Sequence, residues 1–247
     1  MHEELERFQA ELVGSEDPPY YMAVGIVDRD QIDVQAAHGS ASAIRKGRTR
    51  LADIDVRVGS PELDNTHKIR DAGWFESDGR EAVLLPIADD QPRATKMLLW
   101  HGLDNAYREA VRRLLKVRNN AAVKVAPQDA SADFSDAPTV QHTAPTPPFQ
   151  VEGEAWQAAV RSASDVLLDY PVIHDSNVSF QAERIVRRFV SSEGATVQSP
   201  EIRARVSIWA GTTADDGMEI SVTDYVDARS LNQLPSLTQL EDMARRV

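Results

Sequence analysis

Two stretches of this sequence alternate apolar and polar residues with a period of two, and this pattern constrains the fold more than any other feature. In the first, Ile54, Val56 and Val58 lie between charged residues. In the second, residues 202–208, apolar residues at even positions alternate with two arginines and a serine at odd positions. Successive side chains of a β-strand point to opposite faces of a sheet, so each stretch predicts a strand with one buried and one solvated face. Strands of this kind are typical of antiparallel sheets.

Two further strand candidates precede the first alternating stretch. Residues 20–27 are apolar on both faces, and residues 32–37 alternate. Residues 28–31 separate them and include aspartates that favour turns, so the two candidates are predicted to form a hairpin. The basic run at residues 45–48 is interpreted as a connection to the third strand, which gives an antiparallel meander.

Apolar residues at helical spacing predict four helices. They cover residues 5–12, a segment that starts at Asp104, residues 156–167 and a segment that starts at Ser236, where Gln239 occupies the capping-box position. In the second helix the predicted apolar stripe consists of Tyr107, Ala110, Val111, Leu114 and Leu115. Further strands are predicted at residues 183–191 and 218–222, with turns at residues 192–194 and 215–217.

These elements predict an α+β fold of antiparallel sheets packed with helices. Residues 126–150 are rich in proline and have no periodic pattern, which is typical of a linker or a long surface loop. The predicted units are therefore 1–125 and 151–247. Both run helix, strand, glycine turn and charged strand, through either duplication or the chance reuse of a common layout.

Composition excludes several classes of function. The net charge of −12 disfavours DNA as a partner, because the average field of the chain repels polyanions. The chain has no cysteine, which excludes disulfides, thiolate zinc sites and cysteine nucleophiles. No window approaches the roughly 20 apolar residues that span a bilayer, so we expect no membrane partner. The lack of cysteine fits the cytoplasm, and the acidic charge leads us to expect no nucleic-acid partner.

Motifs of metal and phosphate chemistry are missing from the sequence. The six histidines include no pair at helical i, i+3 or i, i+4 spacing, and there is no glycine-rich phosphate loop or nucleophile elbow. Asp64 and His67 could supply two metal ligands, but Asp-Asn-Thr is also typical of a turn or helix cap. Ser192 beside Glu193 has the same two readings, as a nucleophile with a base or as a hairpin turn. The aspartate pairs at 89–90 and 215–216 are interpreted as turns.

Several strings of this sequence resemble the N-terminal region of the TldD/PmbA family of zinc metallopeptidases, also called modulators of DNA gyrase. They are PPYYMAVGIVD, VRVGSPELDNTH, LLPIADDQPRATKMLLWHGLDNAYREA, RRFVSSEGATVQ and ADDGMEI. The resemblance implies an α+β N-terminal domain joined to a second domain that carries a His-Glu-x-x-x-His zinc helix. It also implies a homodimer or paired subunits that enclose a cavity in which peptides are cut.

This chain lacks the zinc motif, so no catalytic residue and no metal ligand is carried over, and no cofactor is expected in the chain itself. We expect a non-catalytic part that shapes the peptide cavity and the subunit interface, with its last helix leading to a metallopeptidase domain outside this sequence. The alternative is a standalone interaction subunit that pairs with a catalytic TldD-like partner. An extended peptide could add to a strand edge at residues 203–209. The candidate cleft or interface residues are Arg57, Asp64, Asn65, Ser192, Glu193, Arg203 and Arg205.

Overall fold

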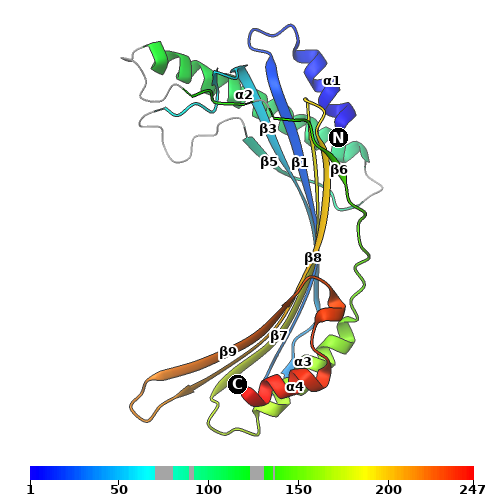
Figure 1. The fold of residues 1–247 in the computed structure, drawn as a ribbon, viewed down its shortest axis with the longest axis vertical. Coiled ribbons are helices and arrows are strands. Elements are labelled where there is room, and N and C mark those ends of the chain that lie inside the picture. Colours follow the sequence, from blue (N-terminus) through cyan, green and yellow to red (C-terminus); the bar gives the residue numbers. More distant parts are fainter. Residues whose placement is uncertain (70–79, 89–91, 123–130, 136) are drawn as a thin grey trace. The chain divides into compact units, whose positions relative to one another are not determined.

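The computed structural model describes residues 1–69, 80–88, 92–122, 131–135 and 137–247. Within these ranges the chain has the predicted α+β fold, with four α-helices packed on a large antiparallel sheet (Figure 1). The elements are α1 (His2–Leu12), β1 (Pro19–Ala37), β2 (Ser40–Ala41), β3 (Arg45–Ser60), β4 (Leu63–Asp64), β5 (Arg80–Leu84), α2 (Pro92–Ala122), β6 (Gln141–Thr143), α3 (Gly153–Leu167), β7 (Asp175–Ser191), β8 (Thr196–Thr213), β9 (Glu219–Ala228), a short 3-10 turn (Leu231–Gln233) and α4 (Leu237–Arg246). The strand order is β4-β3-β1-β7-β8-β6, with β2 beside β1, β5 beside β3 and β9 beside β8.

Strand β1 corrects the predicted hairpin. It runs without interruption through residues 28–31, where the sequence predicted a turn. The basic run at residues 45–48, interpreted as a connection, is likewise the beginning of β3. Both predictions were wrong because they treated charged residues as signals of a loop, whereas in this sheet the aspartates of β1 and the arginines of the basic run have partners on neighbouring strands.

Two aspartates of β1 illustrate this pairing. Oδ1 of Asp28 accepts a hydrogen bond from Nε of Arg50 at 2.6 Å, and its Oδ2 accepts one from Nη1 of Arg188. Oδ2 of Asp30 accepts one from Nη2 of Arg184 at 2.6 Å. Asp28 is buried and Asp30 is partly exposed, and a carboxylate withdrawn from water needs charged donors, so these arginines let the chain stay extended at both aspartates.

The chain divides into two compact units, each made of three segments. Unit 1 comprises Met1–Asp28, Thr49–Ala144 and Val186–Ser199, and unit 2 comprises Arg29–Arg48, Pro145–Ile185 and Pro200–Val247. The sequence-based division places its units in series, whereas these units interleave, because β1, β3, β7 and β8 each contribute residues to both. Periodicity identifies a strand but does not show which part of a long strand belongs to which core.

Residues 126–150, predicted as a linker, are described from residue 131 onward except for residue 136. In this part β6 pairs in parallel with β8, His142 lying opposite Val197. The remainder up to residue 150 has no regular structure, apart from a bend near residue 133. The aspartates at 89–90 lie outside the described residues.

Unit 1 has one apolar core between its helices and its part of the sheet. Residues of α1 and α2, among them Phe8, Leu99 and Leu103, pack against Val24 and Ile54 of β1 and β3. Helix α2 begins at Pro92, earlier than the predicted start at Asp104, because Leu99 and Leu103 extend its buried face. Leu115 was predicted to face the core and is exposed instead.

Unit 2 has a separate core formed by α3 and α4 against its own part of the sheet. Trp156 of α3 stacks on Phe180 of β7 with ring centroids 4.2 Å apart. The predicted capping box at the start of α4 is confirmed, since Ser236 and Gln239 each accept a hydrogen bond from the other's backbone amide. No helix within the described ranges is both long and apolar enough to cross a membrane.

The predicted turns of the second half are confirmed. Gly194 donates its amide proton to the Ser191 carbonyl at 3.1 Å, and Gly217 donates to the Ala214 carbonyl at 2.8 Å. Both glycines have φ +86°, in the left-handed region that favours glycine. Each turn ends a long strand and allows the antiparallel return of the chain, from β7 to β8 and from β8 to β9.

Candidate functional site

Asp64 is a fully buried carboxylate whose two oxygens are both occupied by donors of the protein. Oδ1 accepts hydrogen bonds from the amide of Thr66 at 2.6 Å and from its hydroxyl at 2.7 Å. Oδ2 accepts from the Tyr20 hydroxyl at 2.7 Å and from Nη1 of Arg57 at 3.1 Å. Of the two readings of Asp64, the structure supports the turn, because the bonds to Thr66 form an Asx turn.

The ring of His67 contacts Asp133 rather than Asp64. Nδ1 of His67 lies 2.8 Å from Oδ1 of Asp133, a residue far away in the sequence. Within the described ranges, no three histidine, aspartate or glutamate side chains are grouped so that they could hold a metal ion. The sequence did not indicate Asp133, because nothing in a proline-rich segment marks one aspartate as a partner of a distant histidine.

Asn65 has a structural position. Its side-chain amide donates to the Val56 carbonyl at 3.1 Å, and its Oδ1 accepts from the Val58 amide at 2.8 Å. The residue is completely buried. Asn65 therefore satisfies two backbone groups of β3 in the way that a neighbouring strand would.

The guanidinium of Arg57 lies among aromatic and acidic groups of unit 1. Its Cζ is 4.8 Å from the ring centroid of Phe134 and 6.0 Å from that of Tyr21, and only 12% of the side chain is exposed. Nε lies 3.6 Å from a carboxylate oxygen of Asp55. Arg57 is thus a buried, paired cation rather than a free ligand for a peptide carboxylate.

The surroundings of Tyr20 and Tyr21, close to Asp64, Arg57 and Asp55, disfavour ionisation of both phenols. Burial, together with the hydrogen bond to Asp64, raises the pKa of Tyr20. Burial, followed by the negative charges of Asp55 and Glu193, raises the pKa of Tyr21. Both phenols therefore remain protonated at neutral pH. Tyr20 donates a hydrogen bond to Asp64, and the ring of Tyr21 packs against Phe134.

Ser192 and Glu193 lie at the β7–β8 turn. The Ser192 hydroxyl accepts a hydrogen bond from the Met22 amide at 3.0 Å, and the Ser192 amide donates to the Met22 carbonyl at 2.8 Å. The Glu193 carbonyl accepts from the Thr139 hydroxyl at 3.1 Å. These bonds support the hairpin-turn reading, since the serine hydroxyl is engaged with backbone.

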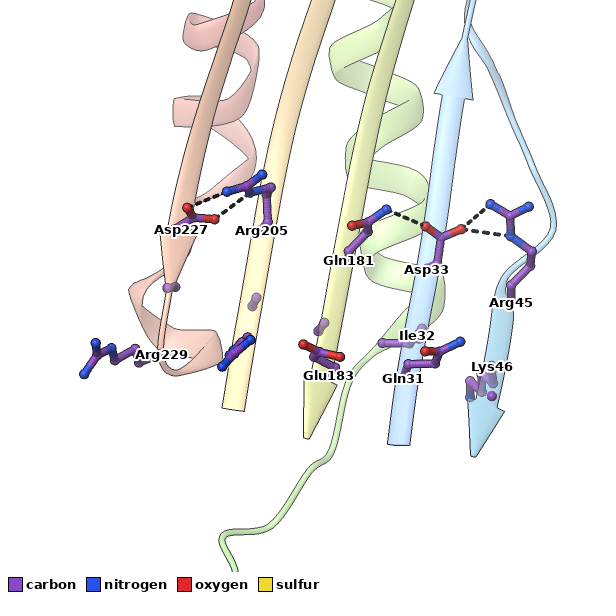
Figure 2. Close-up of a pocket in the computed structure, with 15 residues that line it drawn as sticks. Gln31, Ile32, Asp33, Arg45, Lys46, Gln181, Glu183, Arg205, Asp227 and Arg229 are labelled. Atoms are coloured by element: carbon purple, nitrogen blue, oxygen red, sulfur yellow. Dashed lines mark hydrogen bonds and ion pairs between the residues drawn. The ribbon is translucent and has the colours of Figure 1, made fainter. Parts of the chain in front are cut away.

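Arg203 and Arg205 line a groove of unit 2 with a volume of about 840 Å³. Figure 2 shows the groove from the face of the sheet opposite the helices, with side chains contributed by β1, β3, β7, β8 and β9. Buried Ile32, Ala182 and Ala204 contribute the apolar part of its lining. Its charged residues are five cations, Arg45, Lys46, Arg203, Arg205 and Arg229, and three carboxylates, Asp33, Glu183 and Asp227.

Two ion pairs between strands order the groove (Figure 2). Arg205 of β8 donates through Nε and Nη2 to the two oxygens of Asp227 of β9, at 2.6 and 2.7 Å. Nε of Arg45 of β3 donates to Oδ1 of Asp33 of β1 at 2.9 Å. The side-chain Nε2 of Gln181 donates to Oδ2 of Asp33 at 3.2 Å. These pairs position the side chains at both ends of the groove.

The groove still carries an excess of positive charge. Within the described part of the chain, the side chains of Lys46 and Arg229 have no carboxylate partner, and both residues are exposed. In a chain with a net charge of −12, this is a local reversal of sign. The groove is therefore suited to a ligand that carries negative charge.

The predicted strand edge at residues 203–209 is not an edge. Strand β8 has β7 on one side and pairs with β9 on the other from Ala204 to Thr213. An added peptide strand cannot reach its backbone groups there. Sequence reasoning missed Arg45 and Lys46, although the run of four residues with three basic side chains could have indicated them.

The structure thus defines an α+β module with a polar cluster around buried Asp64 in unit 1 and a basic groove in unit 2. No family model matches the sequence, and no curated protein matches it significantly. Solved structures do match in fold. TldE from Thermococcus kodakarensis aligns with 99% of this chain at a TM-score of 0.59 and 9% identity.

Two proteins described as candidate modulators of DNA gyrase match similarly. The one from Thermotoga maritima aligns with 99% of the chain at a TM-score of 0.57 and 10% identity, and the one from Bacteroides thetaiotaomicron with 99% at 0.55 and 7%. The chain spans about half the length of these structures, between 46% and 49%. The resemblance seen in the sequence is therefore a likeness of fold to part of TldE and the gyrase-modulator proteins.

Proposed function

We propose that this chain is the non-catalytic, peptide-holding part of a TldD/PmbA-type zinc metallopeptidase. The observation that carries the proposal is the alignment of 99% of the chain with about half of each matched structure. A module that corresponds to half of a larger architecture is suited to shape a cavity and an interface for the other half. The groove of unit 2 gives this role a place, since about 840 Å³ lies within the usual range of ligand sites.

The zinc of such an assembly would be held elsewhere. A catalytic zinc site needs three protein ligands from histidine, cysteine or carboxylate side chains. The described residues offer pairs such as His67 with Asp133 but no group of three. The residues present do not fit a catalytic zinc, so we assign no step of peptide hydrolysis to this chain.

A second candidate function is a standalone interaction subunit that pairs with a zinc-bearing, TldD-like partner. The likeness of fold to TldE favours it, because the resemblance to the TldD/PmbA family implies paired subunits. Both candidates share the peptide-holding role. They differ in whether the catalytic domain follows on the same polypeptide or arrives as a separate subunit.

One experiment tests the proposal and separates the two candidates. The 247-residue chain is purified alone and after co-expression with a full-length TldD-like subunit, and zinc content and peptidase activity are measured in both samples. We expect no stoichiometric zinc and no activity in the chain alone, and co-purification with the partner if it is a standalone subunit. Stoichiometric zinc with hydrolysis in the chain alone would overturn the non-catalytic role.

A further inference from the structure

The beginning of β3 is an open edge of the sheet in unit 2. Among the described residues, β5 pairs with the outer side of β3 from Leu51 to Asp55, and β4 pairs with it at Gly59 and Ser60. At Arg45, Lys46 and Gly47, no described strand lies on the side of β3 away from β1. Figure 2 shows this part of β3 as the last strand on its side of the groove.

The backbone of Lys46 faces this open side. The Arg50 carbonyl points outward, because it accepts a hydrogen bond from the Leu85 amide at 2.9 Å. In an antiparallel strand, the amide and carbonyl of alternate residues point to the same side. Lys46 is four residues before Arg50, so its N–H and C=O are directed to the side on which a further strand would pair.

Hollows on both faces of the sheet meet at this edge. The groove of about 840 Å³ lies on the face that carries Asp33, and a second hollow of about 710 Å³ is lined by Asp30. These aspartates are three positions apart in β1, so their side chains are on opposite faces. Both hollows include Lys46 and Gly47 in their lining.

This arrangement matches the needs of an added strand. The side chains of an extended peptide would point alternately to the two faces and so enter the two hollows in turn. Gly47 projects no side chain into either space. Its surroundings are close, since an added Cβ would lie 3.0 Å from the side-chain Nε2 of Gln31.

The charges at the edge select among possible strands. Arg45 and Lys46 line the first hollow together with Asp33, and Lys46, Arg48 and Arg184 line the second together with Asp30 and Glu152. Arg45 pairs with Asp33, and Arg48 and Arg184 pair with Asp30, so Lys46 is the cation of this edge that has no carboxylate partner among the described residues. Two copies of this basic edge would repel each other, which is a common way to prevent unwanted strand pairing. A strand with acidic side chains removes that repulsion and is the occupant that the edge fits.

We propose that the edge of β3 at residues 45–47 binds an extended acidic peptide segment by strand addition, with its side chains alternating between the two hollows. This inference rests on the proposed peptide-holding function and specifies the class of peptide and where it binds. The backbone of Lys46 would supply hydrogen bonds, and its unpaired ammonium would attract glutamate or aspartate side chains.

The test uses the whole chain and a fluorescent ten-residue peptide in which glutamate alternates with threonine. A matched peptide has glutamine in place of glutamate, and binding is followed by fluorescence anisotropy. We expect the acidic peptide to bind at least about tenfold more tightly, and its affinity to fall as salt screens the charges. Equal affinities would overturn the acidic preference and leave the peptide-holding role standing.

Two N-methylated acidic peptides test strand addition separately from charge. One is methylated at every odd amide and the other at every even amide, so only one set removes the N–H groups that would face β3. We expect one peptide to lose binding and the other to keep it. Equal binding by both would show attraction to the groove without strand pairing and would overturn the proposal.

Charge reversal locates the site. Lys46→Glu should weaken binding of the acidic peptide by about tenfold or more, because it replaces attraction with repulsion at the edge. Lys68→Glu is the matched control, because Lys68 is also an exposed lysine but belongs to unit 1, and this change should leave binding unchanged. The proposal would be overturned by equal effects of the two variants or by no binding of any peptide. Co-purification with a catalytic subunit tests the broader proposed function independently.

Discussion

The Tyr20 hydroxyl donates a hydrogen bond of 2.7 Å to Oδ2 of Asp64, across 44 positions of sequence. The same oxygen accepts a hydrogen bond from Nη1 of Arg57. A buried carboxylate with this number of donors connects the start of β1, the last part of β3 and the turn after β4. The DNTH segment, which could be read as a metal site, is therefore a structural junction of unit 1.

Asp64→Asn should destabilise the protein strongly. The substitution keeps the shape of the side chain but leaves the buried Arg57 without its closest negative partner, and breaking a buried ion pair costs about 3–5 kcal/mol. Urea unfolding of both proteins measures the difference. Asp242→Asn is the control, since its pair with Arg245 is exposed on α4 and worth about 0–1 kcal/mol. Similar losses for the two variants would contradict the structural role of Asp64.

Asn65→Ala should cost about 2 kcal/mol or more in the free energy of unfolding. It leaves the Val56 carbonyl and the Val58 amide without their side-chain partner inside the protein, and each unsatisfied buried group costs about 1–3 kcal/mol. Hydrogen exchange should also quicken at the Val58 amide. Asn119→Ala on the exposed side of α2 is the control and should change the stability little. An unchanged exchange rate at Val58 would count against the bridging role.

Much of the secondary structure could be predicted from periodicity, because alternation reflects burial on one face. The stretch around Ile54 and the stretch at 202–208 are strands of the sheet. The turn predicted at 28–31 failed because ion pairs between strands outweigh the local turn preference of Asp28 and Asp30. One partner of Asp28 is Arg188, 160 positions away, and local sequence carries no sign of it.

The candidate site was predictable only in part. Arg203 and Arg205 alternate with buried residues, which placed them correctly on the exposed face of a strand. Arg45 and Lys46 were assigned to a connection, because a short basic run with a glycine is also typical of loops. Their position in the groove follows from the pairing of β3 with β1, where Arg45 meets Asp33, and pairing between strands is a property of the tertiary fold.

Gly102→Ala should destabilise unit 1 by up to about 2 kcal/mol. A Cβ at this position of α2 would lie 2.6 Å from Cδ1 of Ile54 and 2.6 Å from Cγ2 of Val83. Overpacking of a core costs about 1–3 kcal/mol, which outweighs the gain of about 1 kcal/mol from alanine's helix propensity. Gly14→Ala is the control, because nothing lies within 4 Å of its added Cβ. A more stable Gly102→Ala protein would show that the helix does not approach the sheet so closely.

The stability of the fold should decrease in alkaline solution as the half-buried phenols of Tyr20 and Tyr21 ionise. Burial and the bond to Asp64 raise the pKa of Tyr20 above its ordinary value, and burial and the charge of Asp55 raise that of Tyr21. In the unfolded chain both titrate near pH 10, so above that pH the unfolded state releases protons that the folded state still holds. The contribution of these two tyrosines to the free energy of unfolding is therefore fully present below about pH 10 and decreases as the pH rises above that value.

Two measurements check this expectation. Ultraviolet titration of the five tyrosines should show fewer phenols ionising near pH 10 in the folded protein than in urea. Urea unfolding at a series of alkaline pH values should give a shallower decline for Tyr20→Phe than for the unmodified protein, because one of the linked protons is removed. If all five tyrosines of the folded protein ionised together near pH 10, the Tyr20 hydroxyl could not be held in its bond to Asp64.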